Sequence, residues 1–205
     1  MNGRSHPNQR LVEADLATQF GAGRTSIRTA LATLHREGLV VREPHRGARV
    51  RLISDREALE IEQVRNALER LIARIAGTRA TTADVADLQA IIGEMEDRLS
   101  HGDALGYSAL NAPFHQRIWA IADNGLASRL LGTLKSQSIR FQYRTILRPG
   151  RTAQSLCEHR AIVAALATGD PDACETAMAE HLRHVIETLQ WAIDSQARHP
   201  AWAAG

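Results

Sequence analysis

The chain has 205 residues, enough for one or two domains, and 44% of them are hydrophobic, which suffices for a packed core. No stretch approaches the length of a membrane span, no signal-like leader precedes a cleavage site, and two cysteines cannot make a disulfide framework. These features exclude the membrane-spanning and disulfide-stapled secreted classes, and we expect a cytoplasmic protein.

The net charge of +2 conceals an asymmetry between two parts of the chain. Residues 1–54 contain nine arginines against four acidic residues, whereas the remainder carries more acidic than basic residues. Only the first part is therefore suited to bind a polyanion such as DNA.

Residues 16–50 show the pattern of a helix, a tight turn, a second helix and a two-stranded wing. The first helix offers a short apolar face made by Leu16, Ala17 and Phe20. Gly21 and Gly23 then tolerate the backbone angles of a sharp turn. The second helix is predicted to begin at Arg24 and to end before Gly38, with apolar residues at helical spacing: Ile27, Ala30, Leu31 and Leu34. The wing strands are predicted over 39–41 and 48–52.

The start of the second helix is rich in hydrogen-bond donors, as a helix that reads DNA in the major groove requires. We predict that it contacts DNA through Arg24, Thr25, Ser26 and Arg28. The wing is predicted to enter the minor groove through His45, Arg46 and Gly47. The alternative is a two-helix unit that merely caps a larger domain, but turn, helix and basic wing occur together in the order of a winged helix.

Three runs in this part, RLVEADLA, GRTSIRTALATLHREGLV and PHRGARV, resemble the winged helix-turn-helix of the GntR family of bacterial transcriptional regulators. The chain departs from the family pattern at Gly23, where serine is usual, at Ser26, where proline is usual, and at Thr29, where glutamate is common. Family members carry a full helix before the Arg-Leu-x-Glu segment. The resemblance therefore implies a domain that lacks its first helix, either because the true start lies upstream or because the domain is pared down.

From residue 54 onward the hydrophobic pattern predicts only helices, over 57–78, 82–100, 104–122, 125–147, 153–167 and 172–195. The first of them has a predicted buried side made by Leu59, Ile61, Val64, Leu68, Leu71, Ile72 and Ile75. We expect a mainly α protein, with a winged helix-turn-helix over residues 1–53, an all-α antiparallel helical bundle over 54–196 and a loose tail over 197–205.

Four polar residues fall among the apolar positions of this bundle. Asn111 and His115 are four apart on one predicted helix and share a face, while His159 and His181 lie on two later helices. Nitrogen and oxygen ligands that face inward from several helices are how bundles build metal sites. For any single histidine, the alternative is a core or surface residue with satisfied hydrogen bonds. Imidazoles suit zinc, nickel, iron or manganese, and the sequence does not choose among them.

The helical part resembles the FadR-type C-terminal ligand-binding (FCD) domain over roughly residues 57–192, so the two resemblances cover nearly all of the chain. The shared residues include Val64-Arg65-x-x-Leu68-Glu69, Phe114-His115, Glu158-His159 and Gly169-Asp170. In that subfamily an Asp-x-x-x-His pair and two further histidines bind a divalent metal. The resemblance implies a metal site at Asn111, His115, His159 and His181, with Asn111 in the place of aspartate.

The same resemblance implies an effector, typically a small organic acid, that takes open positions on the metal while a guanidinium holds its other end. Arg65 and Arg140 are the candidates for that guanidinium. His184 follows His181 by one turn of helix and is predicted not to be a ligand.

The function we expect is a homodimeric transcriptional regulator, most simply a repressor because most relatives are repressors, that binds a palindromic operator and responds to a small carboxylate effector. One alternative is a metal sensor, in which the ion itself is the signal. Another is a three-histidine metalloenzyme. The chain has no general base placed like the glutamate of His-Glu-x-x-His, and this argues against an enzyme. We therefore expect no catalytic residues.

Overall fold

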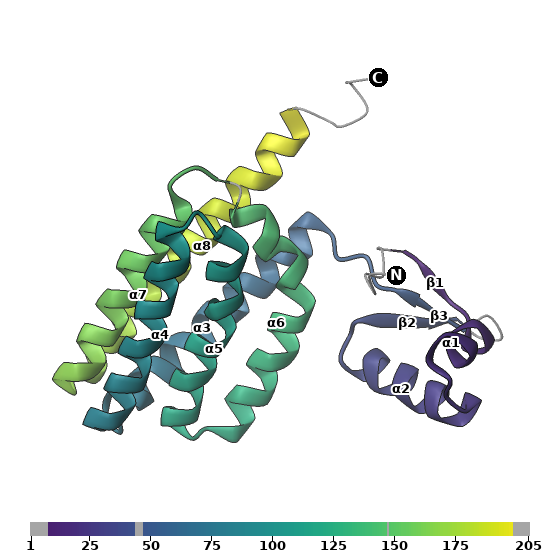
Figure 1. Cartoon of the computed structure of the whole chain (residues 1–205), viewed down its shortest axis with the longest axis horizontal. Helices are drawn as coiled ribbons and strands as arrows, with labels where there is room; N and C mark the ends of the chain where they lie inside the picture. Colours follow the sequence, from purple (N-terminus) through teal and green to yellow (C-terminus); the bar gives the residue numbers. More distant parts are fainter. Residues whose placement is uncertain (1–7, 44–46, 147, 199–205) are drawn as a thin grey trace. The chain divides into compact units, whose positions relative to one another are not determined.

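The computed structural model describes residues 8–43, 47–146 and 148–198, except for the side chains of 43, 139, 140, 142–144, 146 and 196–198. These residues form two compact units, the first made mainly by the chain up to Ser54 and the second mainly by the chain from Asp55 onward (Figure 1). Each unit has its own hydrophobic core. The order of a small mixed unit followed by a helical unit confirms the predicted fold class. Within the described residues, no helix is both long and apolar enough to cross a membrane.

The first unit contains two helices and a three-stranded antiparallel sheet. Its elements are β1 (Arg10–Leu11), α1 (Glu13–Phe20), α2 (Arg24–Arg36), β2 (Val40–Glu43) and β3 (Gly47–Val50). The strand order is β1-β3-β2, so β3 lies in the middle of the sheet. Gly21 ends α1 in the left-handed conformation (φ +61°), which is the sharp turn that the glycines predict.

The core of this unit joins α2 to the sheet through Leu11, Ile27, Leu31, Val40 and Ala48. The predicted apolar face of the first helix is partly wrong, because Phe20 is 67% exposed, whereas Leu16 and Ala17 pack against the core. The sequence analysis also missed β1, because a strand of two residues is too short to show an alternating pattern.

The second unit is a bundle of helices that follow the predicted segments closely. Its elements are α3 (Asp55–Gly77), α4 (Thr82–Ser100), α5 (Ala104–Ala122), α6 (Gly125–Ile146), α7 (Arg151–Thr168) and α8 (Pro171–Arg198). Local capping sets several of the ends: Thr81 and Asp84 form a reciprocal capping box on α4, and the Asp103 side chain accepts from the Gly106 amide at the start of α5. Helix α7 begins two residues earlier than predicted.

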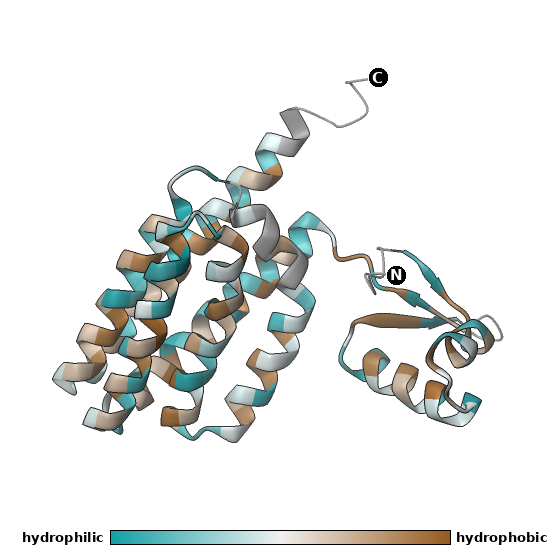
Figure 2. Cartoon of the chain, viewed as in Figure 1, coloured by the Kyte–Doolittle hydropathy of each residue, from teal (hydrophilic) through white to brown (hydrophobic). Residues whose placement is uncertain are grey.

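Packing within the bundle pairs α3 with α8, α4 with both α5 and α7, and α7 with α8. Hydrophobic and hydrophilic residues alternate along each helix, so that each one can bury one side (Figure 2). The side chains that are buried most completely include Ile72, Leu88, Met95, Phe114, Ile118, Leu131, Ile162, Leu166, Met178 and Leu182.

The buried side of α3 differs from the prediction. Val64 and Leu71, predicted to be buried, are 52% and 45% exposed. Glu62, Arg65 and Glu69 are buried instead. Residues at i, i+3 and i+7 form one stripe of a helix, so these three charged side chains share the inward face. A bundle buries charge only where partners compensate it, and this stripe leads to the candidate site.

Gly77, the last residue of α3, marks a close approach to the start of α8. A Cβ atom at Gly77 would lie 2.8 Å from Cys174 Sγ and 3.1 Å from Pro171 Cα. Gly77→Ala is therefore expected to lower the free energy of unfolding by about 1–3 kcal/mol through overpacking. The matched control is Gly93→Ala, because Gly93 lies in the middle of α4 with open space around it, and there alanine should stabilise by roughly 0.5–1 kcal/mol. Urea denaturation of both variants measures the difference, and equal effects would contradict this close contact.

Candidate metal centre and DNA-reading surface

Three of the predicted ligands meet inside the bundle. His115 on α5, His159 on α7 and His181 on α8 each offer a ring nitrogen, and these nitrogens all lie within 4.8 Å of one another. All three side chains are buried, and their ring centroids are 4.7–5.8 Å apart. Three imidazoles drawn from three helices and directed at one point can coordinate a divalent transition metal.

A buried carboxylate, Glu69, and a partly buried one, Glu158, each contact one of these rings. Glu69 Oε2 lies 3.1 Å from Nδ1 of His115, and Glu158 Oε2 lies 2.7 Å from Nδ1 of His181. In metal sites a ligating histidine usually donates its other ring N–H to a carboxylate, which fixes the tautomer and the direction of the ring. With Nδ1 engaged in this way, Nε2 is the nitrogen of each ring that can meet a metal.

Two buried atoms of the centre have no hydrogen-bond partner among the described residues: Nε2 of His181 and Oδ1 of Asn111. Asn111 lies one helical turn before His115 on α5, as the spacing predicts. Buried polar atoms are nearly always paired in folded proteins, so these two require a partner that is not a protein atom. An imidazole nitrogen and an amide oxygen are both able to bind a metal, and the residues present therefore fit the implied ion.

The electrostatics of the centre favour a neutral His181 and an ionised Glu69, whereas burial raises the pKa of Glu158. Burial lowers the pKa of His181 well below its usual value, and the positive charges of His115, Arg151 and Arg65 lower it further. A neutral imidazole is the form that binds metal. Burial alone would raise the pKa of Glu69, but the charge of His115, its hydrogen bond and the charge of Arg65 outweigh burial and hold that pKa below its usual range.

The structure describes the side chain of only one of the two predicted effector contacts, Arg65 and Arg140. Arg65 is buried, and its Nε and one terminal nitrogen lie 3.2 Å from Glu69 Oε1 and 2.9 Å from Glu62 Oε2. It therefore compensates the charge of two buried carboxylates. Arg140 lies in α6, but its side chain is outside the described part. Direct contact of either residue with an effector stays a prediction.

The sequence analysis missed the residues that support the histidines. Glu69 accepts from Trp119 Nε1 at 2.9 Å as well as facing His115, and Glu158 accepts from a terminal nitrogen of Arg151 at 3.0 Å. Acidic residues on the apolar stripe of a helix are rarely buried without a partner. Glu69, four residues after Arg65 on the stripe of α3, carried that signal in the sequence.

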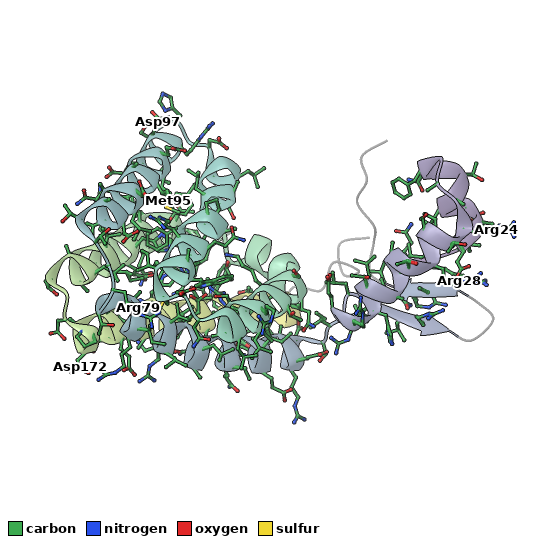
Figure 3. All side chains as sticks on the ribbon, turned by 90° about the horizontal axis from the view of Figure 1, so that it is seen from below. Arg24, Arg28, Arg79, Met95, Asp97 and Asp172 are labelled. Carbon is green, nitrogen blue, oxygen red and sulfur yellow. The ribbon has the colours of Figure 1, made fainter. Side chains whose placement is uncertain are left out.

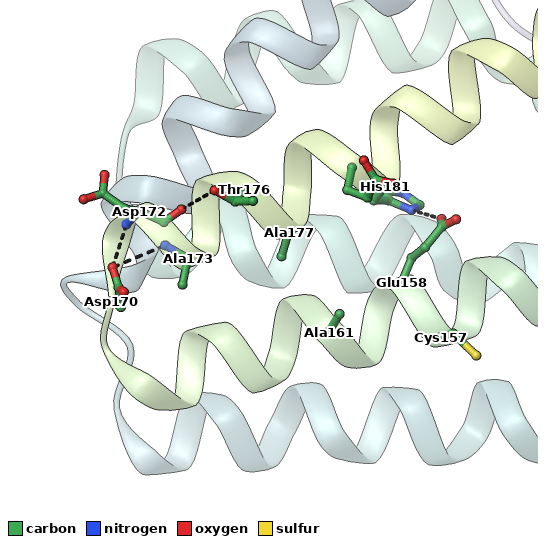
Figure 4. A pocket seen from close by; sticks show the side chains of 10 residues that line it. Cys157, Glu158, Ala161, Asp170, Asp172, Ala173, Thr176, Ala177 and His181 are labelled. Carbon is green, nitrogen blue, oxygen red and sulfur yellow. Dashed lines mark hydrogen bonds and ion pairs between the residues drawn. The ribbon is translucent and has the colours of Figure 1, made fainter.

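A groove of about 690 Å³ between α7 and α8 reaches the centre at Glu158 and His181 (Figure 4). Alanines line its middle, and Asp170 and Asp172 lie at its other end. His184 Nδ1 lies 2.8 Å from Glu158 Oε1 and is not part of the three-histidine cluster. His184 therefore contacts the carboxylate of Glu158 and lies outside the group of candidate ligands.

The predicted DNA-reading residues of α2 all lie on the surface of the first unit. Arg24, Thr25, Ser26 and Arg28 are exposed, and the two arginines project away from the helix (Figure 3). The guanidinium of Arg28 lies 3.3 Å from Glu13, and an exposed ion pair of this kind contributes little, so Arg28 can exchange this partner for a phosphate.

In the wing, His45 and Arg46 lie outside the described residues, whereas Gly47 begins β3. Gly47 has φ +88°, and a Cβ atom there would lie 2.6 Å from the carbonyl oxygen of Leu11. Only glycine fits such a position, so this residue shapes the wing whether or not it also meets DNA.

His181→Ala is expected to weaken the binding of Zn²⁺ or Ni²⁺ by more than about a hundredfold, because it removes one of few ligands and leaves the carboxylate of Glu158 without its ring partner. Isothermal titration calorimetry on metal-stripped protein measures the affinity. His101→Ala is the control, because His101 is exposed at the end of α4. This variant should bind metal with the affinity of the wild type. Equal affinities of both variants would rule out the cluster as the metal site.

Glu69→Gln keeps the shape of the side chain but removes the charge that orients His115. Loss of such a supporting carboxylate typically costs 10–100-fold in metal affinity, and we expect a loss in that range. Glu60→Gln on the same helix removes an exposed carboxylate and serves as the control. Unchanged metal affinity in Glu69→Gln would show that the ring of His115 needs no carboxylate.

Comparison with known families matches both units. The family described as bacterial regulatory proteins, gntR family, matches residues 1–50, and the FCD domain matches residues 60–184. The HTH-type transcriptional repressor RspR of Escherichia coli (strain K12) is 28% identical over 184 residues, which cover 90% of this chain and 81% of RspR. A probable D-xylose utilization operon transcriptional repressor of Paenarthrobacter nicotinovorans is 28% identical over 174 residues, which cover 83% of this chain and 74% of that protein.

Among solved structures, McbR/YncC of E. coli superposes with a TM-score of 0.78 at 22% identity, over 90% of this chain and 88% of that one. This likeness supports the fold. The family matches extend over more than half of the chain and include both the DNA-reading unit and the helical unit. The chain therefore belongs to the GntR family of bacterial transcriptional regulators with an FCD domain, which makes it a DNA-binding regulator rather than an enzyme.

Proposed function

We propose that the protein is a homodimeric repressor whose operator affinity is controlled by a small organic acid bound at a divalent metal. The observation that carries the proposal is the cluster of three buried imidazoles, two of them backed by carboxylates, inside the helical unit of a DNA-binding chain. His115, His159, His181 and Asn111 would hold the ion. The chemistry it supplies when bound is that of a Lewis acid, which attracts a carboxylate oxygen of the effector.

The chain's own residues prepare this binding in three ways. Glu69 and Glu158 orient two rings, and the charge of these carboxylates offsets part of the charge of the ion. Burial excludes water from the ligands, which strengthens every electrostatic contact. Arg65 balances the charge of Glu69, and we propose Arg65 and Arg140 as the guanidinium groups that hold the other end of the effector.

On the DNA side, the proposal gives α2 the role of recognition helix, with Arg24, Thr25, Ser26 and Arg28 at phosphates and base edges. His45, Arg46 and Gly47 of the wing would reach the minor groove. A dimer with two-fold symmetry would present two such helices to successive major grooves about 34 Å apart, so the operator is a short palindrome. Repression is proposed because two relatives are named repressors. Such a protein works in the cytoplasm, where operator DNA is found.

Effector and operator are linked thermodynamically in this proposal. An acid that binds better to the free protein than to the DNA-bound protein lowers operator affinity, and by reciprocity operator DNA lowers the affinity for the acid. The test uses an operator selected from a random duplex library and follows DNA retardation while metal and organic acids are added separately. Release by acid only in the presence of metal supports the proposal. Release by metal alone, with no further effect of any acid, would replace it with a metal sensor.

Arg28→Ala is expected to reduce operator affinity at least about tenfold, because a recognition-helix arginine typically contributes 1–3 kcal/mol. Fluorescence anisotropy of labelled operator measures the loss, and the salt dependence should become shallower if the lost contact is to phosphate. Arg36→Ala, at the other end of the same helix, is the matched control and should bind nearly as the wild type does. If the Arg28→Ala protein is folded and binds the operator as tightly as the wild type, this edge of α2 does not contact DNA.

A further inference from the structure

Polar residues continue beyond the metal centre along two helices of the bundle. The stripe on α5 consists of Tyr107, Asn111 and His115. The stripe on α7 consists of Arg151, Ser155 and His159. Residues four apart share a helix face, so each stripe runs for two turns and ends at a histidine of the centre.

The two stripes approach each other at the histidines, and Tyr107 of the first stripe interacts electrostatically with Arg151 of the second. At one end the rings of His115 and His159 are 5.8 Å apart. At the other end Tyr107 lies close enough to Ser155 and Arg151 for both to act on its pKa. The polar surface that begins at the histidines thus extends toward Arg151 and Tyr107.

Arg151 is a buried cation, 6% exposed, with only part of its hydrogen-bonding capacity used. One terminal nitrogen lies 3.0 Å from Glu158 Oε2, the same oxygen that lies 2.7 Å from Nδ1 of His181. The other terminal nitrogen is buried and makes no hydrogen bond to any described residue. A guanidinium presents five N–H donors in a planar fork that suits carboxylates and phosphates, and a buried donor without an acceptor is costly.

Tyr107 adds a second donor beside Arg151. Its side chain is 3% exposed, and burial raises the pKa of its hydroxyl to about 12, so the phenol keeps its proton at neutral pH. The Ser155 hydroxyl lies within hydrogen-bond reach of this phenol and lowers its pKa in opposition to burial. The Tyr107 oxygen can accept from Ser155 and still donate its own proton to an acidic group, because the two hydroxyls each both donate and accept, whereas Arg151 only donates.

We propose that Arg151 and Tyr107 form an anion-binding subsite that holds a second acidic group of the effector, whose first acidic group lies at the metal. The proposal rests on the proposed function, because it needs the metal-bound acid. It makes the effector a short dianion. Only the carboxylate of Glu158 separates the guanidinium from the ring of His181, so the two acidic groups are a few carbon atoms apart.

A purely structural role would explain the position of only one of the two terminal nitrogens of Arg151. Charge compensation of Glu158 uses one terminal nitrogen, and the second nitrogen would then be buried for no gain. The two roles predict different binding behaviour. A structural arginine acts on the metal through Glu158 and His181, so its loss affects every metal-bound acid equally. A subsite arginine affects only acids with a second anionic group.

The experiment titrates acetate, succinate and 3-phosphonopropionate into the full chain loaded with Zn²⁺ and follows heat and tryptophan fluorescence. Trp119 reports on the centre because it donates to Glu69, which faces His115. Wild-type protein should bind at least one dianion ten or more times more tightly than acetate. The preferred dianion tells whether the subsite takes a carboxylate or a phosphonate, and either preference supports the proposal.

Arg151→Gln should abolish this preference, so that the ratio of dianion affinity to acetate affinity falls to about one; the acids are titrated at saturating Zn²⁺, so that any change in metal affinity transmitted through Glu158 does not enter the ratio. Tyr107→Phe, which removes one oxygen only, should weaken the preferred dianion several-fold and leave acetate unchanged. Arg160→Gln is the matched control on α7, because Arg160 is half exposed and pairs with Glu96.

Three results would overturn the subsite: no preference for a dianion in the wild type, equal weakening of acetate and dianion in Arg151→Gln, or no effect of either variant. The proposed function fails in a different way. If the dianion binds through Arg151 but never alters operator affinity, the subsite stands and effector control of DNA binding does not. If metal-loaded wild type binds none of the three acids, both proposals are wrong.

Discussion

The enclosure of two carboxylates, the buried Glu69 and the partly buried Glu158, is the constraint on which the helical unit depends. An ionised carboxylate is costly inside a bundle unless cations and hydrogen bonds compensate it. Arg65, His115 and Trp119 surround Glu69, and Arg151, His181 and His184 surround Glu158. Glu69 therefore ties side chains of α3 and α5 together, Glu158 does the same for α7 and α8, and each carboxylate contacts a histidine ring.

These two clusters explain why the interior departs from a purely apolar core. Helix α3 turns the stripe with Glu62, Arg65 and Glu69 inward and leaves Val64 and Leu71 partly exposed. Apolar residues such as Phe114 and Ile118 close the core around the centre on α5. Packing supplies the stability of the bundle, while the polar centre supplies a place where a ligand can change the energetics of the fold.

In the proposed function, a signal from ligand to DNA would pass first along the chain itself. Helix α3, which carries Arg65 and Glu69, starts at Asp55, and only residues 51–54 separate it from strand β3 of the winged unit. A ligand that changes how Glu69 and His115 interact acts on the helix that continues directly from the DNA-reading unit. Coupling of this kind needs a difference in ligand affinity between DNA-bound and free states, and the polar centre provides groups whose contacts can differ.

Much of this organisation was predictable from the sequence. The helix positions followed from apolar spacing and from glycine and proline breaks, and the histidines of three helices meet as their helical positions suggested. The inward face of α3 was not predictable from hydrophobicity alone, because seven apolar residues spread around more than one side of the helix. Strand β1 was too short to carry a pattern. Glu158 directly precedes the predicted ligand His159 in the sequence, but its contact with His181 of another helix depends on tertiary packing.

The central claim is that the buried histidines form a metal site set up by Glu69 and Glu158. Anomalous diffraction from crystals of the full chain soaked in Ni²⁺, recorded at the nickel absorption edge, tests it most directly. The account predicts one strong peak per chain, bonded to Nε2 of His115 and His181 and to a ring nitrogen of His159, with Glu69 and Glu158 still on the Nδ1 atoms. A peak at His184 or at the surface, with none among the three buried rings, would contradict it.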